Sequence, residues 1–177
     1  MELREVMQKR KSIRQYLTTP VEEEKVKAMI EAAILAPTWK NAQEIRYYVA
    51  VSEEKRQAVL DALGEGNRKK TQNAPVFLIS AVILNRAGFQ KDGTADNELG
   101  NGWGYYDLGL HDENLILRAR ELGLDTLIMG IRDEKELREA FDIPKEESIV
   151  SVISVGYSDA DPDRPTRKSV EEIAKFF

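Results

Sequence analysis

The chain has 177 residues, of which 42% are hydrophobic and 32% are charged, and its net charge is −5. This size and composition suit one domain over residues 1–177 with a buried core, and the net acidity argues against a broad nucleic-acid interface. The absence of cysteine and the presence of a single histidine, His111, exclude disulfides, thiolate nucleophiles and multi-histidine metal centres. No stretch predicts a membrane span or a secretory signal, so we expect a cytoplasmic protein.

The first part of the chain predicts two helices. Apolar residues at helical spacing predict a helix over residues 2–9. The segment TTPVEEEKVKAMIEAAILAP predicts a second helix, with Thr19 as N-cap, Pro20 at the first helical position and Glu22 completing a capping box. This helix should end before Pro37, because the residue that precedes a proline avoids helical geometry.

The middle of the chain predicts two strands, a helix and a long loop. RYYVAV, residues 46–51, predicts a strand, and the next segment predicts a helix capped by Ser52 and stopped by Gly64. The continuous apolar run PVFLISAVIL, residues 75–84, predicts a buried central strand. Residues 86–104 are rich in glycine and lack a clear period, which is typical of a lid or a binding loop.

The last part of the chain again alternates helices and strands. A helix is predicted over residues 105–122, followed by the strand DTLIMG and a short helix from Asp133 to Phe141 with Glu136 at the capping-box position. SIVSVISVGY predicts a strand, and Ser169 and Glu172 form a capping box for a final helix. Taken alone, this alternation predicts a doubly wound parallel sheet.

Positive charge gathers near both ends of this acidic chain. The clusters are RKSIRQY, with Arg10, Lys11 and Arg14, and DRPTRKS, with Arg164, Arg167 and Lys168. If the fold joins the two ends, the clusters could clamp one anion, because a guanidinium donates two parallel hydrogen bonds to phosphate. Ser12 would add a hydroxyl donor. The alternative is that both clusters are solvated surface charge.

Other chemical motifs are weak. GNGWG, residues 100–104, lacks the GxGxxG spacing and follows a loop, so a Rossmann dinucleotide site is not expected. Asp107 and His111 could share a metal on one helix, but a helix-surface pair is the simpler interpretation because a stable site needs three or four ligands. The loop acids lack the spacing of a calcium site and should be solvated: Asp92, Asp96 and Glu98. We expect no metal and no catalytic side chain, so that a cofactor would carry any chemistry.

Four motifs, in order, resemble the FMN-dependent nitroreductase family. RKSIRQY is similar to the family's RRSIRxF/Y opening, and APTWKNAQ, residues 36–43, to its APSxxNxQPW segment. GYYDLGLHDENLILRARELGLDTLIMG resembles its DxGxxxxNLLLxAxxLGLxT helix and strand, and the basic tail resembles its closing phosphate-binding segment. The chain departs from the pattern at Glu44 and Ile45, which replace a Pro-Trp pair, and at 177 residues it would be a short member.

The resemblance implies an α+β fold with a mixed, mostly antiparallel sheet flanked by helices, in place of the parallel sheet. It also implies an intertwined homodimer that binds FMN at the subunit interface. The implied activity is that of an NAD(P)H-dependent flavin oxidoreductase: NADH or NADPH reduces the flavin and leaves, and a small acceptor such as a nitroaromatic or quinone then takes its place in a ping-pong mechanism. The alternatives are a non-catalytic flavin-binding module, acting as a sensor or store, and a same-fold enzyme of other flavin chemistry such as reductive dehalogenation.

The same resemblance assigns residues to the cofactor. Arg10 and Ser12 would bind the FMN phosphate, and Lys11 would lie near the ribityl chain. Arg14 would sit beside the pyrimidine end of the ring, where a guanidinium stabilises the negative charge of reduced flavin. The phosphate site would be completed by Arg167 together with Arg164.

Further residues are assigned to the flavin ring. The partner subunit would supply Pro37, Thr38, Trp39 and Asn41. Asn67 and Lys70 would also reach the ring, and the backbone of Met129 and Gly130 would meet flavin N5. Plainer alternatives are that Trp39 is an interface aromatic, that Asn41 caps a turn and that Gly130 ends a strand. Candidates to line the substrate pocket, or simply to pack, are Phe89, Trp103, Tyr105 and Tyr106.

Overall fold

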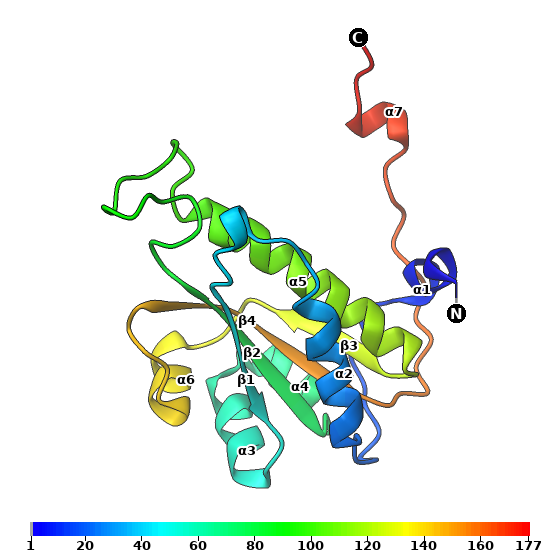
Figure 1. Ribbon diagram of the computed structural model, residues 1–177. Coiled ribbons are helices and arrows are strands. Elements are labelled where there is room, and N and C mark those ends of the chain that lie inside the picture. The colour runs from blue at the N-terminus through cyan, green and yellow to red at the C-terminus, as the bar shows by residue number, and fades with distance from the viewer. Residues whose placement is uncertain (1) are drawn as a thin grey trace.

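A computed structural model describes residues 2–177, and in it an antiparallel sheet separates two layers of helices (Figure 1). The sheet has the order β1-β2-β4-β3, and every neighbouring pair is antiparallel. The strands are β1 (Ile45–Ala50), β2 (Val76–Ile83), β3 (Asp125–Met129) and β4 (Glu147–Gly156). A parallel bridge between Ser12 and Thr126 adds a short mixed edge. The parallel sheet predicted from the alternation of elements is therefore wrong, and the mostly antiparallel α+β fold is confirmed.

The helices divide between the two faces of the sheet. α2 and α5 pack together on one face, while α3 and α6 pack together on the other (Figure 1). The helical segments are α1 (Leu3–Lys9), α2 (Glu23–Ala33), the 3-10 turn η1 (Trp39–Asn41), α3 (Glu53–Ala62), α4 (Glu65–Thr71), α5 (Gly102–Glu121), α6 (Glu134–Phe141) and α7 (Val170–Ile173). Among residues 2–177, none of these helices is long and apolar enough to cross a membrane.

Strand β2 lies in the middle of the core. Its alternate side chains enter opposite layers, with Val76 and Leu78 on the side of α2 and α5 and Phe77 and Ile79 on the side of α3 and α6. Burial on both faces favours apolar residues at nearly every position, which explains the run PVFLISAVIL, and its one polar residue, Ser80, forms a hydrogen bond with Ser151. The prediction of a buried central strand is confirmed. Because helices cover both faces of the sheet, the apolar sequence of β2 resembles that of a strand in a parallel sheet, although β2 pairs antiparallel with both of its neighbours.

Most helix starts follow their local sequence. The side chain of Ser52 accepts a hydrogen bond from the Lys55 N–H at 3.2 Å, and the capping box of Ser169 is present as predicted. One predicted boundary is wrong, because helix α2 begins at Glu23 rather than after Thr19. Helix α3 ends at Ala62 with Leu63 as its C-cap, directly before Gly64 as predicted, and Gly64 also caps the start of α4, a helix that the sequence did not predict.

Replacing the Ser52 cap tests how much this local signal contributes to stability. We expect Ser52→Ala to lower the free energy of unfolding by about 1 kcal/mol, because the N–H that it satisfies loses its partner. Urea unfolding measures the change, and Ser52→Thr, which retains a capping hydroxyl, should recover most of it. An unfolding midpoint in the alanine variant equal to that of the wild type would contradict this role for Ser52.

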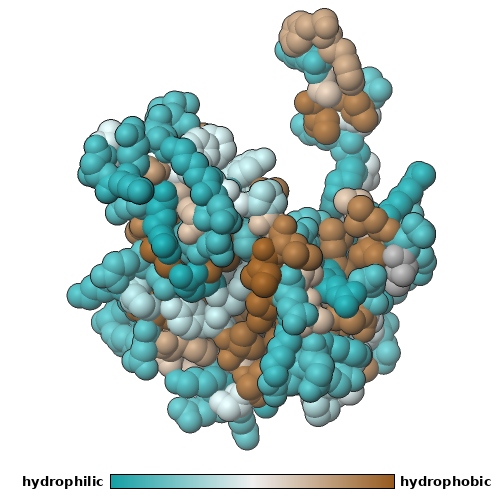
Figure 2. Space-filling view, viewed as in Figure 1, coloured by the Kyte–Doolittle hydropathy of each residue, from teal (hydrophilic) through white to brown (hydrophobic). Residues whose placement is uncertain are grey.

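The segment after β4 leaves the body of the protein. It runs past α1, and α7 projects away from the rest of the structure (Figure 1). This tail carries exposed apolar side chains at Val170, Ile173, Phe176 and Phe177. Figure 2 shows further apolar side chains on the body, where exposed residues include Leu3, Met7, Ile34 and Leu35.

Candidate functional site

The first basic cluster runs beside β3. The Ile13 N–H donates to the Thr126 carbonyl at 3.0 Å, and the Ile13 side chain is 2% exposed. In this extended segment neighbouring side chains point to opposite sides, so Ser12 and Arg14 face outward. The strand that they flank continues to Met129, which is also buried.

The tail brings the second basic cluster to the first. Arg164 donates to the Gln8 carbonyl at 3.2 Å, and Lys11 forms an ion pair with Asp161. The two segments enclose a pocket of about 100 Å³, and its lining includes Arg10, Lys11, Ser12, Arg14, Asp163, Arg164 and Arg167. We call these residues the basic pocket. The structure thus brings the two basic clusters together at one pocket, which the charge pattern had suggested as one possibility.

The chemistry of the basic pocket fits a phosphate monoester. Its four guanidinium groups, one ammonium and one hydroxyl are all hydrogen-bond donors, and Asp163 is the carboxylate among the lining residues. Arginine forks match phosphate oxygens in geometry as well as in charge. These residues are therefore suited to hold the phosphate of FMN.

The end of β3 lies close to the start of α4. A Cβ added at Gly64, the N-cap of α4, would lie 3.0 Å from a methyl group of Ile131. A Cβ added at Gly130 would meet nothing within 4 Å, so its backbone is open to a flat molecule. The structure therefore places α4, which carries Asn67 and Lys70, beside the backbone position assigned to flavin N5.

The segment from Pro37 to Asn41 lies apart from the basic pocket within one chain. It packs near the start of α5, where the Trp39 N–H donates to Asp107 Oδ2 at 2.7 Å. Helix α1, which leads into the basic pocket, packs toward the other end of α5, near Arg118 (Figure 1). Asp107 and Arg118 are about 16 Å apart along the helix axis. One chain does not bring all the predicted ring contacts together.

The backbone from Thr38 to Gln43, called here the 38–43 turn, is strained. Lys40, Asn41 and Gln43 have φ angles of 48°, 57° and 50°, in the left-handed region that non-glycine residues rarely adopt. Each such residue costs about 1–3 kcal/mol unless its surroundings fix it, with asparagine at the low end. Strain of this kind gathers at functional sites, which agrees with a ligand-facing role for the turn.

The loop over residues 86–104 packs against the 38–43 turn. The rings of Trp39 and Trp103 are 4.3 Å apart, and Tyr106 packs edge-on to Trp103 at 5.8 Å. Gly88 permits this packing, because its φ is +80° and a Cβ there would lie 2.4 Å from the Gly100 carbonyl oxygen. Helix α5 begins within the predicted loop, three residues before its predicted start.

One acidic residue of the loop, Asp96, contacts the 38–43 turn instead of being solvated as predicted. Asp96 accepts hydrogen bonds from the Trp39 indole at 3.1 Å and from Lys40 at 2.7 Å, and its side chain is 16% exposed. The Lys40 ammonium lowers the pKa of this carboxyl group. The expectation that Asp96 is a solvated loop acid is therefore wrong, because it anchors the turn.

A group of buried titratable residues lies below the turn. Asp107 and His111 are 4% and 5% exposed, so their interpretation as a helix-surface pair is wrong. Glu44 is fully buried, and burial raises its pKa to about 7. Burial also raises the pKa of Asp112, which accepts from the Tyr47 hydroxyl at 2.9 Å, to about 6. The sequence marked this region by the pair Asp107 and His111 and by Glu44, which stands where the family has proline, but it did not predict that these residues are buried together.

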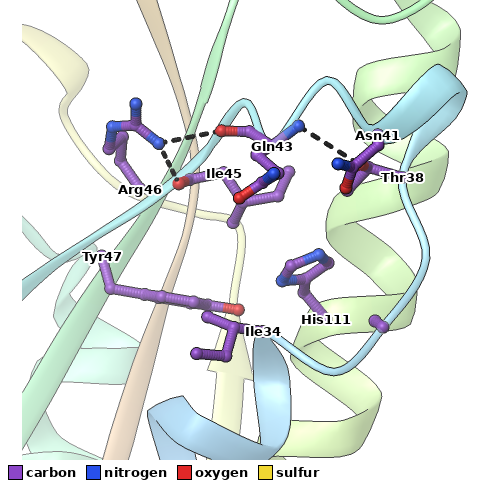
Figure 3. A pocket seen from close by; sticks show the side chains of 9 residues that line it. Ile34, Thr38, Asn41, Gln43, Ile45, Arg46, Tyr47 and His111 are labelled. Carbon is purple, nitrogen blue, oxygen red and sulfur yellow. Dashed lines mark hydrogen bonds between the residues drawn. The ribbon is translucent and has the colours of Figure 1, made fainter.

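A cavity of about 250 Å³ lies between the turn, β1 and α5, and Figure 3 shows the side chains that line it. The His111 imidazole points into it from α5, with Gln43 and Tyr47 on other walls. Among residues 2–177 neither ring nitrogen of His111 has a hydrogen-bond partner, and burial lowers the pKa of the ring. Across the same residues, no group of three or more histidine, cysteine, aspartate or glutamate side chains is placed to hold a metal ion.

Comparison with known proteins assigns the chain to a protein family. The sequence model of the nitroreductase family matches residues 7–157. The chain belongs to the nitroreductase family. The match covers the basic RKSIRQY segment, the 38–43 turn, α5 and β3, and thus most of the elements that carry predicted site residues.

Relatives of this nitroreductase-family chain include named flavin reductases. A Bacillus subtilis protein named FMN reductase (NAD(P)H) is 29% identical over 167 residues, which are 89% of this chain and 65% of that protein. An Archaeoglobus fulgidus protein, provisionally named NADH dehydrogenase/NAD(P)H nitroreductase, is 27% identical over 87% of this chain and 84% of its own length. A solved nitroreductase family protein of Clostridium difficile has a TM-score of 0.82 and 25% identity, with 99% of this chain and 98% of that one covered.

A further solved structure supports the fold. It comes from Exiguobacterium sibiricum, is provisionally named a nitroreductase and was crystallised in complex with FMN. Its TM-score is 0.86 at 22% identity, and the match covers 99% of this chain and 97% of that chain. The antiparallel sheet with helices on both faces is therefore the fold of this family.

Proposed function

We propose that this chain is an FMN-dependent oxidoreductase that passes electrons from NADH or NADPH to a small organic acceptor. Family membership and relatives named FMN reductase and NADPH-flavin oxidoreductase support the flavin and the nicotinamide donor. The observation that carries the proposal is the basic pocket, in which cations from both ends of an acidic chain meet around one small space.

In this proposal each part of the site has a separate task. Arg10, Ser12 and Arg164 hold the phosphate, with Lys11 and Arg167 completing the basic pocket. Asn67, Lys70 and the open backbone at Gly130 lie along the ring. When bound, FMN supplies the chemistry by accepting a hydride and passing on the electrons. The side chains orient the cofactor and balance its charge, and none of them is proposed as a general acid.

Arg14 tests the electrostatic part of the proposal. We expect Arg14→Ala to lower the midpoint potential of the bound flavin by about 20–60 mV. The variant removes a positive charge whose interaction stabilises the reduced flavin by about 1–3 kcal/mol. A spectroelectrochemical titration measures the shift. Arg4→Ala, an exposed arginine on α1 outside the basic pocket, is the control. A potential that stays unchanged or rises in Arg14→Ala would place this arginine away from the ring.

The proposal includes a homodimer. Pro37, Thr38, Trp39 and Asn41 lie toward the opposite end of α5 from the basic pocket, so a second copy is needed to bring them to the same flavin. The exposed apolar side chains of the tail and the body favour association, since an isolated chain would leave them in water. Sedimentation or light scattering tests this point.

We further propose that the acceptor is a nitroaromatic or a quinone and that both substrates use one pocket in turn. Trp103 and Tyr106, which pack beside the 38–43 turn, would offer aromatic surface to a flat acceptor. Parallel lines in double-reciprocal plots, obtained by varying both substrates, are expected for this ping-pong order.

The visible spectrum of the purified protein tests the function. We expect a flavin spectrum that bleaches when NADH or NADPH is added without oxygen and returns when a quinone is added. A flavin that neither nicotinamide reduces would favour a binding module without turnover. A protein that takes up no FMN would contradict the proposal as a whole.

A further inference from the structure

One buried charged group fixes the 38–43 turn to the body of the protein. Asp107 accepts the Trp39 backbone N–H at 2.7 Å and is 4% exposed. The other carboxylate on the turn, Asp96, belongs to the loop over residues 86–104 and binds the indole of Trp39 and the ammonium of Lys40. The placement of the strained turn on α5 therefore depends on Asp107.

Asp107 faces a second carboxyl group. Glu44 directly follows the turn, is fully buried and packs against α5 one helical turn before Asp107, since a Cβ added at Gly104 would lie 3.9 Å from the Glu44 Cγ. The Asp107 carboxylate raises the pKa of Glu44, and neither Glu44 oxygen accepts a hydrogen bond from a donor among residues 2–177. Two adjacent carboxylates cannot both stay charged in such a place, so one of them holds a proton. Protonated Glu44 can donate to Asp107, which leaves Asp107 as the charged acceptor for Trp39.

We propose that Glu44 and Asp107, sharing one proton, are the positioning residues of the 38–43 turn, which the proposed function places against the cofactor. Removal of that proton puts two negative charges beneath the turn. The turn then moves relative to α5, and its contact with the flavin ring weakens. The enzyme would hold its cofactor less tightly above neutral pH.

The surroundings assign the shared proton to Glu44. The other charged or titratable groups here are Arg86 after β2, Asp96 on the loop, and His111 and Asp112 on α5, with the Tyr47 hydroxyl bonded to Asp112. Burial raises the pKa of Glu44 to about 7, and the Asp107 charge acts in the same direction. The pKa values of His111 and Asp96 are both lowered, whereas burial raises the pKa of Asp112 to about 6, so variants are needed to assign a step near pH 7 to Glu44.

The two tryptophans of the chain give a readout that does not require the cofactor. Trp39 lies on the turn and Trp103 lies against it. We would follow their backbone and indole N–H resonances in ¹⁵N-labelled protein from about pH 5 to about pH 9, with and without saturating FMN. The Trp39 amide, bonded to Asp107, should shift in one step near pH 7.

Three variants decide the origin of that step. It should vanish in Glu44→Gln and persist in Glu139→Gln, which makes the same change at an exposed site on α6. It should also persist in His111→Asn. A step that survives in Glu44→Gln, a step that is lost in His111→Asn, or no step in the wild type would overturn the proposal.

A second measurement links the pair to the cofactor. We expect Asp107→Asn to raise the Kd for FMN about tenfold at neutral pH, because the turn loses its charged acceptor. Asp92→Asn, in the exposed part of the loop, is the control. An unchanged Kd in Asp107→Asn would overturn the link to the cofactor. Wild-type protein that binds no FMN would instead contradict the proposed function, and the Trp39 resonances would still decide the role of the carboxyl pair.

Discussion

Arg10→Ala is expected to weaken FMN binding by about 10- to 150-fold. Arg10 is the C-cap residue of α1 and lines the basic pocket together with Ser12 and Arg164. Its alanine variant removes a charge-assisted hydrogen bond to phosphate, and such bonds contribute roughly 1.5–3 kcal/mol. Titration of apoprotein with FMN, followed by quenching of flavin fluorescence, gives the Kd directly.

Arg4→Ala is the matched control for this experiment. Arg4 is an exposed arginine on α1, six residues before Arg10, and it does not line the basic pocket. Its removal changes the net charge equally and should leave the Kd within about twofold, since distant surface charges are screened. Equal losses of affinity in the two variants would mean that net charge, and not a built phosphate site, attracts the flavin.

Glu44→Gln is expected to make the protein more stable at alkaline pH. In the wild type, burial raises the pKa of Glu44 from 4.5 to about 7. A carboxyl group with a raised pKa contributes its full stability below pH 4.5 and loses it as the pH rises through 7. The loss is about 3 kcal/mol for a fully buried group, and glutamine, which has no charge to bury, avoids it.

Urea unfolding at about pH 5 and about pH 8, with FMN saturating, measures this effect. The two proteins should be similar at the lower pH, and the variant should be more stable by about 2–3 kcal/mol at the higher pH. Asp112, with a pKa raised to about 6, makes both proteins lose some stability over the same range. Glu139→Gln should follow the wild type, and stability curves that run parallel in wild type and Glu44→Gln would refute the buried-charge argument.

Helix boundaries could be predicted where the decisive contact is local. The caps at Ser52, Asp133 and Ser169 use a residue and a backbone N–H three positions later, so a short stretch of sequence contains the whole interaction. Thr19 failed as a cap because the chain before α2 is held from a distance. The Tyr157 hydroxyl donates to Glu22 at 2.7 Å, and the helix starts directly after that residue.

Strand direction could not be predicted from periodicity. A strand that is covered on both faces is almost entirely apolar in either type of sheet, and β2, with Ser80 as its one polar residue, is such a strand. The four family motifs supplied the antiparallel sheet instead. The helix α4 that follows Gly64 was not predicted, and the end of α3 before it is also fixed from a distance, because Leu63 pairs with Arg132, which is far away in the sequence.

Only part of the candidate site could be predicted from the sequence. Three cations within five residues of an acidic chain drew attention to Arg10 and Arg14, and the tail cluster pointed to the same anion. Asp107 and Glu44 were noticed only as a possible metal ligand and as a departure from the family motif, and their pairing was not predicted, because aspartate and glutamate are usually exposed and the packing of β1 against α5 buries them. Burial of a charge is a tertiary property and cannot be read from spacing.

The placement of the 38–43 turn and the basic pocket toward opposite ends of α5 has a genetic consequence. In a dimer of the proposed kind, each flavin takes its phosphate contacts from one chain and part of its ring contacts from the other. A chain with a defective basic pocket and a chain with a defective turn would each be inactive alone. Paired with one another, they would rebuild one intact centre and leave the second doubly damaged, so two harmful alleles would complement, with each mixed dimer carrying half of the activity of a normal dimer.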